Sequence, residues 1–158
     1  MMNRRDLLAH AAKLAALLAS AGLLPQTAHA AHAAQAAYNA AVFEVKTMAE
    51  LARLLGGNAP TESKDVTVTG PDIAENGAVV PISVATTLPG VKRLLVLVEK
   101  NPSVLSAMFY VSDSVDANFS TRVKMGQSSN VYAVAMMGDG KLLFAQKEVK
   151  VTLGGCGG

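Results

Sequence analysis

Tryptophan is absent from the 158 residues of this chain, and histidine and cysteine are scarce. The one cysteine is Cys156, and the three histidines are His10, His29 and His32, all near the amino terminus. Residues 33–155 therefore contain neither residue type. This excludes a catalytic triad or dyad that uses histidine, a thiolate or imidazole metal site, and a c-type haem site made by this chain alone. A single cysteine also excludes an internal disulfide.

The charge of the chain gives no sign of nucleic acid binding. The formal net charge is +2, from 14 lysines and arginines against 12 aspartates and glutamates. Three of the cations, Arg4, Arg5 and Lys13, lie within the first thirty residues, where Asp6 is the only acid. The rest of the chain is therefore close to neutral, and it carries no arginine cluster of the kind that binds nucleic acid.

The first thirty residues have the features of a targeting peptide. Arg4–Arg5 precede an apolar stretch at residues 14–24, and Ala28–Ala30 form a small-residue cleavage signal. The segment Asn3–Leu8 resembles a twin-arginine export motif. The apolar stretch is shorter than the roughly 20 residues that a membrane span requires. We therefore expect a periplasmic protein without a membrane anchor, exported by a twin-arginine signal peptide (residues 1–30) and cleaved near Ala30.

Residues 31–63 are expected to form an alanine-rich leader and one short helix. A three-and-four spacing of apolar residues predicts the helix over residues 42–55, and Gly56-Gly57 ends it. The apolar positions are Val42, Val45, Met48, Ala49, Ala52 and Leu55. Residues 59–63 are expected to be a linker.

The hydrophobic period changes to two over residues 64–153. Seven strands are expected, at residues 66–69, 79–86, 91–98, 106–111, 119–125, 131–137 and 141–153. Residues 91–98 are apolar enough for burial on both faces, and Pro81 indicates an edge position or a bulge. Gly138-Asp139-Gly140 predicts a tight hairpin turn. This pattern predicts a mainly β fold, an immunoglobulin-like antiparallel β-sandwich over residues 64–153.

Two other groups of residues are weak candidates for metal binding. Asp113 and Asp116, near Asn118, lack the glycine and the bidentate glutamate of an EF-hand loop, so we expect solvated turn residues. Four methionines fall on strand positions and are expected to fill the core. These are Met108, Met125, Met136 and Met137.

The last five residues, Gly154-Gly155-Cys156-Gly157-Gly158, place the only cysteine between paired glycines. Because glycine-rich segments behave as flexible coils, residues 154–158 are predicted to form a flexible arm that carries the thiol. From Leu153 to Cys156 an extended chain spans about 10 Å, enough to place the sulfur inside another protein's cleft. No histidine, lysine or arginine neighbours Cys156 in sequence, so a visiting enzyme must supply the charge that activates the thiol.

Residues 147–158, a strand followed by this glycine-rich tail, resemble the carboxyl terminus of the SoxY family. SoxY proteins are the sulfur-carrier subunits of the periplasmic thiosulfate-oxidising (Sox) system. Three further stretches fit the same family, namely Asp72–Pro81, Val98–Pro102 and Thr121–Met125. The resemblance covers the whole chain after the predicted cleavage site.

The resemblance implies a covalent carrier that has neither a catalytic residue nor a cofactor of its own. It implies pairing with the β-sandwich protein SoxZ, and covalent substrate attachment at Cys156. The haem c enzyme SoxAX would join thiosulfate to that cysteine as an S-thiosulfonate, and the thiosulfohydrolase SoxB would release sulfate from it. Whether the sulfur dehydrogenase SoxCD then oxidises the remaining sulfane sulfur is left open. The four flanking glycines would let the arm enter a narrow channel.

Two other functions of the tail are compatible with the residues. Cys156 would serve only as an intermolecular disulfide link if the protein were a β-sandwich interaction module in an oxidising compartment. The chain ends in Gly157-Gly158, and a terminal pair of glycines is also typical of carriers that use a glycyl thiocarboxylate. Those carriers need ATP-dependent activation in the cytosol, which the export signal opposes.

Overall fold

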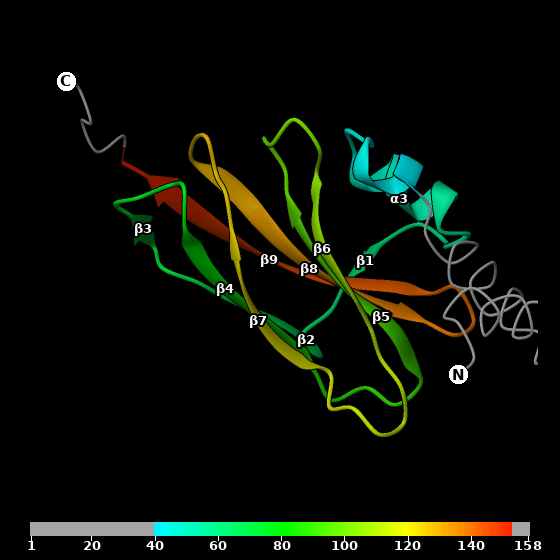
Figure 1. The fold of residues 1–158 in the computed structure, drawn as a ribbon. Helices are drawn as coiled ribbons and strands as arrows, with labels where there is room; N and C mark the ends of the chain where they lie inside the picture. Colours follow the sequence, from blue (N-terminus) through cyan, green and yellow to red (C-terminus); the bar gives the residue numbers. More distant parts are fainter. Residues whose placement is uncertain (1–39, 153–158) are drawn as a thin grey trace, which may run out of the picture. The chain divides into compact units, whose positions relative to one another are not determined.

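The computed structural model describes residues 40–152, which are mainly β-strands and loops with little helix (Figure 1). Two short helical segments come first, the 3₁₀-helix η1 (Ala40–Phe43) and the α-helix α3 (Met48–Leu54). Nine strands follow within this range: β1 (Thr61–Glu62), β2 (Val66–Thr69), β3 (Ile73–Ala74), β4 (Val80–Thr86), β5 (Val91–Val98), β6 (Leu105–Tyr110), β7 (Asn118–Val123), β8 (Ser129–Met137) and β9 (Leu142–Val151). The predicted signal peptide lies outside the described residues.

The strands form two sheets that pack face to face. The larger sheet has the order β1-β9-β8-β5-β6, with β3 also paired to β9, and the smaller sheet has the order β2-β4-β7. All seven predicted strands are present, and the predicted β-sandwich is confirmed. The seven predicted strands pair antiparallel, and two further strands that the sequence analysis did not predict, β1 and β3, pair parallel to β9. Both strands have only two residues, too few to show a period in the sequence.

The core between the sheets follows from the alternation of side chains along each strand. In β5, Leu94, Val96 and Val98 pack with residues of the smaller sheet such as Ile82, and all four are at most 1% exposed. Successive side chains of a strand point to opposite faces, so the residues between them face the other way. Leu95 and Leu97 accordingly belong to a separate buried cluster. Both faces of β5 are therefore buried, as its apolar sequence predicts.

The second cluster lies between the larger sheet and the two helical segments. Val42 from η1 and Leu51 from α3 pack there with Leu95, Leu97 and Val134 of the sheet. Leu and Val side chains contribute roughly 1.5–3 kcal/mol each when fully buried. The helical segments therefore shield apolar surface that the smaller sheet does not cover (Figure 1).

The helix prediction over residues 42–55 was wrong in its extent, because residues 44–47 are not helical and the α-helix begins only after Thr47. The Thr47 hydroxyl accepts a hydrogen bond from the Glu50 N–H at 3.1 Å, and the Glu50 carboxylate accepts one from the Lys46 N–H at 3.0 Å. The second bond lowers the pKa of Glu50. Thr47 is thus the N-cap of a new helix that starts at Met48, and the Glu50 side chain reaches back to the residue before the cap. The new start shifts the buried face, so Leu51 is buried and Ala49 is exposed.

Two turn-forming sites behave as the sequence predicts. Gly140 has a φ of +84°, and the Met137 N–H bonds to the Lys141 carbonyl at 2.9 Å, which closes the β8–β9 hairpin. Pro81 pairs only with Arg122 of β7, because the β2–β4 ladder ends at Ser83. Pro81 therefore occupies a local edge of an otherwise central strand.

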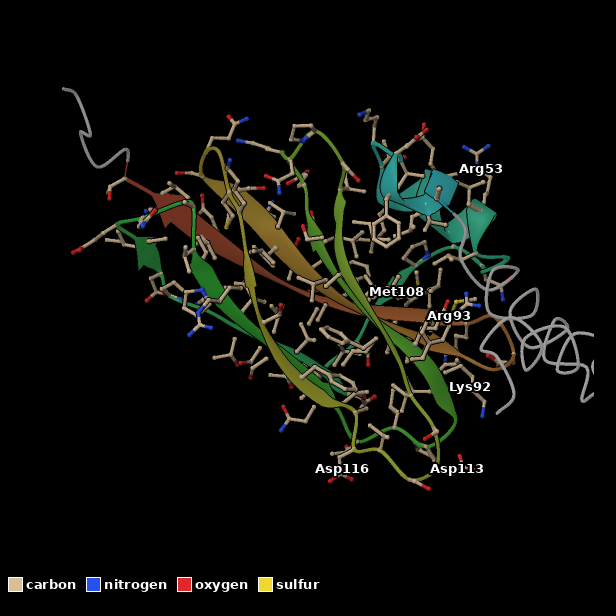
Figure 2. All side chains as sticks on the ribbon, viewed as in Figure 1. Arg53, Lys92, Arg93, Met108, Asp113 and Asp116 are labelled. Carbon is tan, nitrogen blue, oxygen red and sulfur yellow. The ribbon has the colours of Figure 1, made fainter. Side chains whose placement is uncertain are left out.

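The residues that were weak candidates for metal binding lie either in the hydrophobic core or on an exposed loop. Met125 and Met136 are buried, and Met108 and Met137 pack against the two clusters, which confirms the prediction that the methionines fill the core. Asp113 and Asp116 are exposed on the loop between β6 and β7 (Figure 2). Within residues 40–152, no three carboxylate, thiol or imidazole groups gather in a metal-binding arrangement. The same range holds no helix long and apolar enough to cross a membrane.

Gly77, in the β3–β4 turn, lies against the backbone of the β7–β8 loop and a side chain at the end of β9. The Met125 N–H donates to the Gly77 carbonyl at 2.7 Å. A Cβ atom at Gly77 would lie 2.3 Å from the Met125 carbonyl oxygen and 2.8 Å from Cγ1 of Val151. Since the first of these atoms is backbone, it cannot turn aside as a side chain would, and residue 77 must lack a side chain.

Replacing Thr47 by alanine is expected to lower the free energy of unfolding by about 1 kcal/mol, because the Glu50 N–H loses its cap. Urea unfolding followed by circular dichroism measures the loss. The Thr47→Ser variant keeps the capping oxygen and serves as the matched control. Equal losses in the two variants would show that the cap contributes nothing.

The Gly77→Ala variant is expected to lose about 1–3 kcal/mol of unfolding free energy, because the added Cβ forces the turn away from Met125. Gly126→Ala is the matched control, since nothing lies within 4 Å of a Cβ at that position. The control should stay within about 0.5 kcal/mol of the parent protein. The same urea titration measures both, and a Gly77→Ala variant as stable as the control would contradict the close contact.

Candidate functional site

The sequence places the candidate site in the carboxyl-terminal tail. Cys156 and the predicted arm glycines Gly154, Gly155, Gly157 and Gly158 lie outside the described residues. The structure does describe the strand that leads to them. The described residues end at Thr152, four residues before Cys156, and we call this end of β9 the tail base.

Hydrogen bonds on both sides hold the end of β9. On one side, the Lys150 N–H donates to the Asp72 carbonyl at 2.9 Å, and the Thr152 N–H donates to the Ala74 carbonyl at 3.1 Å. On the other side, the Val151 N–H donates to the Ser128 hydroxyl oxygen at 2.9 Å. Three successive N–H groups are thus satisfied alternately by β3 and by Ser128. The chain is therefore tied to the body of the protein up to Thr152.

An exposed ion pair connects the start of β3 to β9. The Lys147 Nζ atom lies 2.6 Å from Oδ1 of Asp72. The hydrogen bond and the charge of Lys147 hold the pKa of Asp72 below its usual value, with a smaller contribution from the charge of Lys150. The Asp72 side chain is 89% exposed, so the pair adds little to stability. Its effect is to fix the position of the short strand β3 along β9.

The loops beside the tail base are joined to one another. The Asn101 side-chain amide donates to the Lys124 carbonyl at 2.7 Å, which ties the β5–β6 loop to the β7–β8 loop. The next residue, Met125, bonds to Gly77, and Gly77 lies against Val151. The stretches Asp72–Pro81, Val98–Pro102 and Thr121–Met125 therefore contribute to one end of the sandwich, where β9 ends (Figure 1). We call this region the arm end.

Sequence reasoning missed the residues that hold the tail base. Ser128 was not singled out, since a serine before a strand is common and carries no distinct signal. Asp72 and Ala74 were noted only as part of a stretch that resembles a family. Their contacts with β9 join residues about eighty positions apart, so no local pattern could reveal them.

One hollow among the described residues lies away from the tail base. It has a volume of about 820 Å³ and is lined by the β4–β5 turn and the β6–β7 loop, including Asp113 and Asp116 (Figure 2). Its lining contains aspartate, threonine and one lysine, and it holds neither histidine nor cysteine. This hollow and the end of β9 occupy opposite ends of the sandwich.

Comparisons with known proteins point to one family. Residues 51–156 match the sequence model of the sulfur oxidation protein SoxY, and this match includes Cys156. No curated protein sequence matches the chain. The solved structure of the sulfur carrier protein SoxY from Chlorobium limicola f thiosulfatophilum is 36% identical, with a TM-score of 0.61. The match covers 68% of this chain and 97% of that one.

A second solved structure shows the fold alone. A superoxide reductase (neelaredoxin) from Ignicoccus hospitalis matches with a TM-score of 0.53 over 68% of this chain and 100% of that one, but the identity is only 14%. The β-sandwich is thus shared with proteins of other functions. The family match covers more than half of the chain and agrees with the 36% identical structure, and on these grounds the chain belongs to the SoxY family of sulfur oxidation proteins.

Proposed function

We propose that this protein is a periplasmic carrier that holds thiosulfate-derived sulfur covalently on Cys156 and presents it to partner enzymes. Membership of the SoxY family, together with the likeness to a solved sulfur carrier, supports the carrier role. Cys156 is the only thiol of the chain and lies within the matched residues. The observation that carries the proposal is the position of this thiol in the sequence, four residues beyond Thr152, whose N–H is bonded to the Ala74 carbonyl.

The number of residues between Thr152 and Cys156 sets how far the sulfur can lie from the body of the protein. Four residues from Thr152 to Cys156 span at most about 13 Å when extended. That distance lets the thiol enter an enzyme cleft, while the body of the protein stays outside. Since the chain has no histidine or cysteine between residues 33 and 155, the enzymes would supply the catalytic groups.

Loading would form one sulfur–sulfur bond, between Sγ of Cys156 and the sulfane sulfur of thiosulfate. The thiol loses its proton, and the two reactants together lose two electrons. A haem c enzyme of the SoxAX type would accept these electrons. The product is a cysteine S-thiosulfonate, which keeps one of the two negative charges of thiosulfate.

Hydrolysis would then remove the terminal sulfone group. A thiosulfohydrolase of the SoxB type would direct water to that sulfur and break its bond to the sulfane sulfur. Sulfate and one proton leave, and a persulfide stays on Cys156. SoxCD would oxidise this persulfide in organisms that have the enzyme, and SoxZ would be the paired subunit of the carrier.

Cys156→Ser is expected to abolish loading. The test incubates the intact, exported protein with thiosulfate, the haem c enzyme and an oxidised electron acceptor, and follows its intact mass. The parent protein should gain one thiosulfate, and addition of the hydrolase should shorten this adduct to one extra sulfur atom. The Cys156→Ser variant should gain nothing.

Two other results of this experiment would overturn the carrier proposal. Reducible dimers without any thiosulfate adduct would show that Cys156 is only a disulfide link. A mass change on Gly158 that persists in Cys156→Ser would show a thiocarboxylate carrier instead. Digestion and sequencing of the terminal peptide distinguish the three cases.

Gly155→Val is expected to slow enzymatic loading about tenfold, equivalent to about 1.4 kcal/mol in the transition state. The reason is that a branched side chain widens the tail and restricts its backbone. Gly155→Ala should have a smaller effect. Alkylation of Cys156 by a small reagent is the control and should proceed at the parent rate in both variants. Unchanged loading by the enzyme would refute the need for a narrow tail.

A further inference from the structure

The end of β9 is held differently from the rest of the strand. Its pairing with β8 runs along Leu142–Val149 and stops there. Beyond Val149, the Lys150 and Thr152 N–H groups donate to carbonyls of the β3 segment, and the Val151 N–H donates to the Ser128 hydroxyl oxygen. The short strand β3 therefore supplies two of the three hydrogen bonds that hold the N–H groups of residues 150–152.

The strand β3 has few contacts of its own. It consists of two residues, of which Ala74 is buried and Ile73 is 57% exposed. A segment with so little buried surface opens at a low free energy compared with the whole fold. An exposed ion pair that adds little to the stability of the whole protein can therefore be a large share of what keeps β3 in place.

Lys147, the cation of that ion pair, lies at a core-facing position of β9. Val149 is buried in the inter-sheet core and Val151 packs against it. Because side chains alternate along a strand, Lys147 is on the same face as these two residues. Its side chain is only 30% exposed, and lysine is rarely buried without a partner. The Asp72 carboxylate, 2.6 Å from the Lys147 Nζ atom, is that partner.

Asp72 holds β9 at two points that are three residues apart. Its side chain bonds to Lys147, and its backbone carbonyl accepts the hydrogen bond of Lys150 at 2.9 Å. A slip of β3 by one residue along β9 would separate the ion pair and turn Ala74 out of the core. The side chain and the backbone of Asp72 together therefore set the register of β3 on β9.

We propose that Asp72 is a positioning residue for the loading of Cys156, acting through Lys147 and β3 on the end of β9. The proposal rests on the carrier function. If β3 let go of β9, the β8 ladder would end seven residues before Cys156, whereas Thr152 lies four residues before it. An enzyme that takes up the thiol would then have to order more of the chain, which weakens binding. The chemical step on the bound thiol would be unaffected.

Amide hydrogen exchange, followed by NMR, tests the hold of β3 on β9. Asp72→Lys places two ammonium groups together and is expected to make the Lys150 and Thr152 N–H groups exchange about tenfold faster. The Val151 N–H, which bonds to Ser128, should change less. Ser128→Ala should give the reverse pattern, with the largest change at Val151. The urea unfolding midpoint of Asp72→Lys should match that of the parent, since the ion pair is exposed.

Loading kinetics with thiosulfate and the haem c enzyme test the role in the reaction. Asp72→Lys is expected to raise KM for the carrier about tenfold, because more chain must be ordered, and to leave kcat within about twofold. Asp72→Glu keeps the charge and should keep the parent KM. The double variant Asp72→Lys, Lys147→Glu restores a pair of opposite charges and should bring KM back towards the parent value.

Asp113→Lys is the matched control. Asp113 is exposed on the β6–β7 loop, at the opposite end of the sandwich from the end of β9 (Figure 2). The same change from aspartate to lysine there should alter neither KM nor the exchange of residues 150–152. Alkylation of Cys156 by a small reagent should proceed at the parent rate in all of these variants.

The outcomes separate this inference from the carrier function on which it rests. Parent-like exchange or a parent-like KM in Asp72→Lys would overturn the positioning role while the carrier function stands. A KM that stays raised in the double variant, or rises equally in Asp113→Lys, would also overturn it, because the effect would then come from added charge. A parent protein that takes up no thiosulfate would instead overturn the carrier function, and with it the role of Asp72 in loading.

Discussion

The pairing of β9 is the constraint on which the rest of this structure depends. The strand pairs with β8 along Leu142–Val149, and with β1 and β3 near its two ends. Its last N–H groups are bonded alternately to β3 and to Ser128. The described end of the strand is therefore held on both edges, up to Thr152. A firmly held strand end would suit a carrier, because the tail that bears the thiol is then attached at a constant place on the body of the protein.

Burial on both faces of the larger sheet makes that anchor rigid. The smaller sheet covers one face, and η1 with α3 covers part of the other. Apolar residues such as Leu94 and Leu95 therefore contribute to two clusters from adjacent positions of a single strand. The Thr47 cap starts α3 at Met48, and Leu51 of this helix belongs to the second cluster. The arm end is in this way supported by packing that extends through the whole sandwich, although few residues touch the tail itself.

Chemistry and positioning occupy separate parts of the proposed carrier. The tail supplies one thiol and the smallest possible side chains around it, so that different enzymes can accept the same peptide. The arm end supplies the base of the tail, where the Lys150 and Thr152 N–H groups are bonded to the Asp72 and Ala74 carbonyls. Dividing the tasks in this way leaves the body of the protein unchanged while an enzyme's own groups act on the sulfur. It also explains how a chain without histidine between residues 33 and 155 can take part in this reaction sequence.

The sequence by itself determined the seven main strands, the two-faced burial of residues 91–98 and the isolated cysteine of the tail. Each of these is a local property, readable from a period of two or from a residue type. Only the tertiary structure decided that β1 and β3 pair parallel to β9, and that Ser128 and Gly77 meet Val151. Two-residue strands and a lone serine carry no period, so their partners are chosen by the packing of distant segments. For the same physical reason, three stretches that stand apart in the sequence become the single surface from which the tail departs.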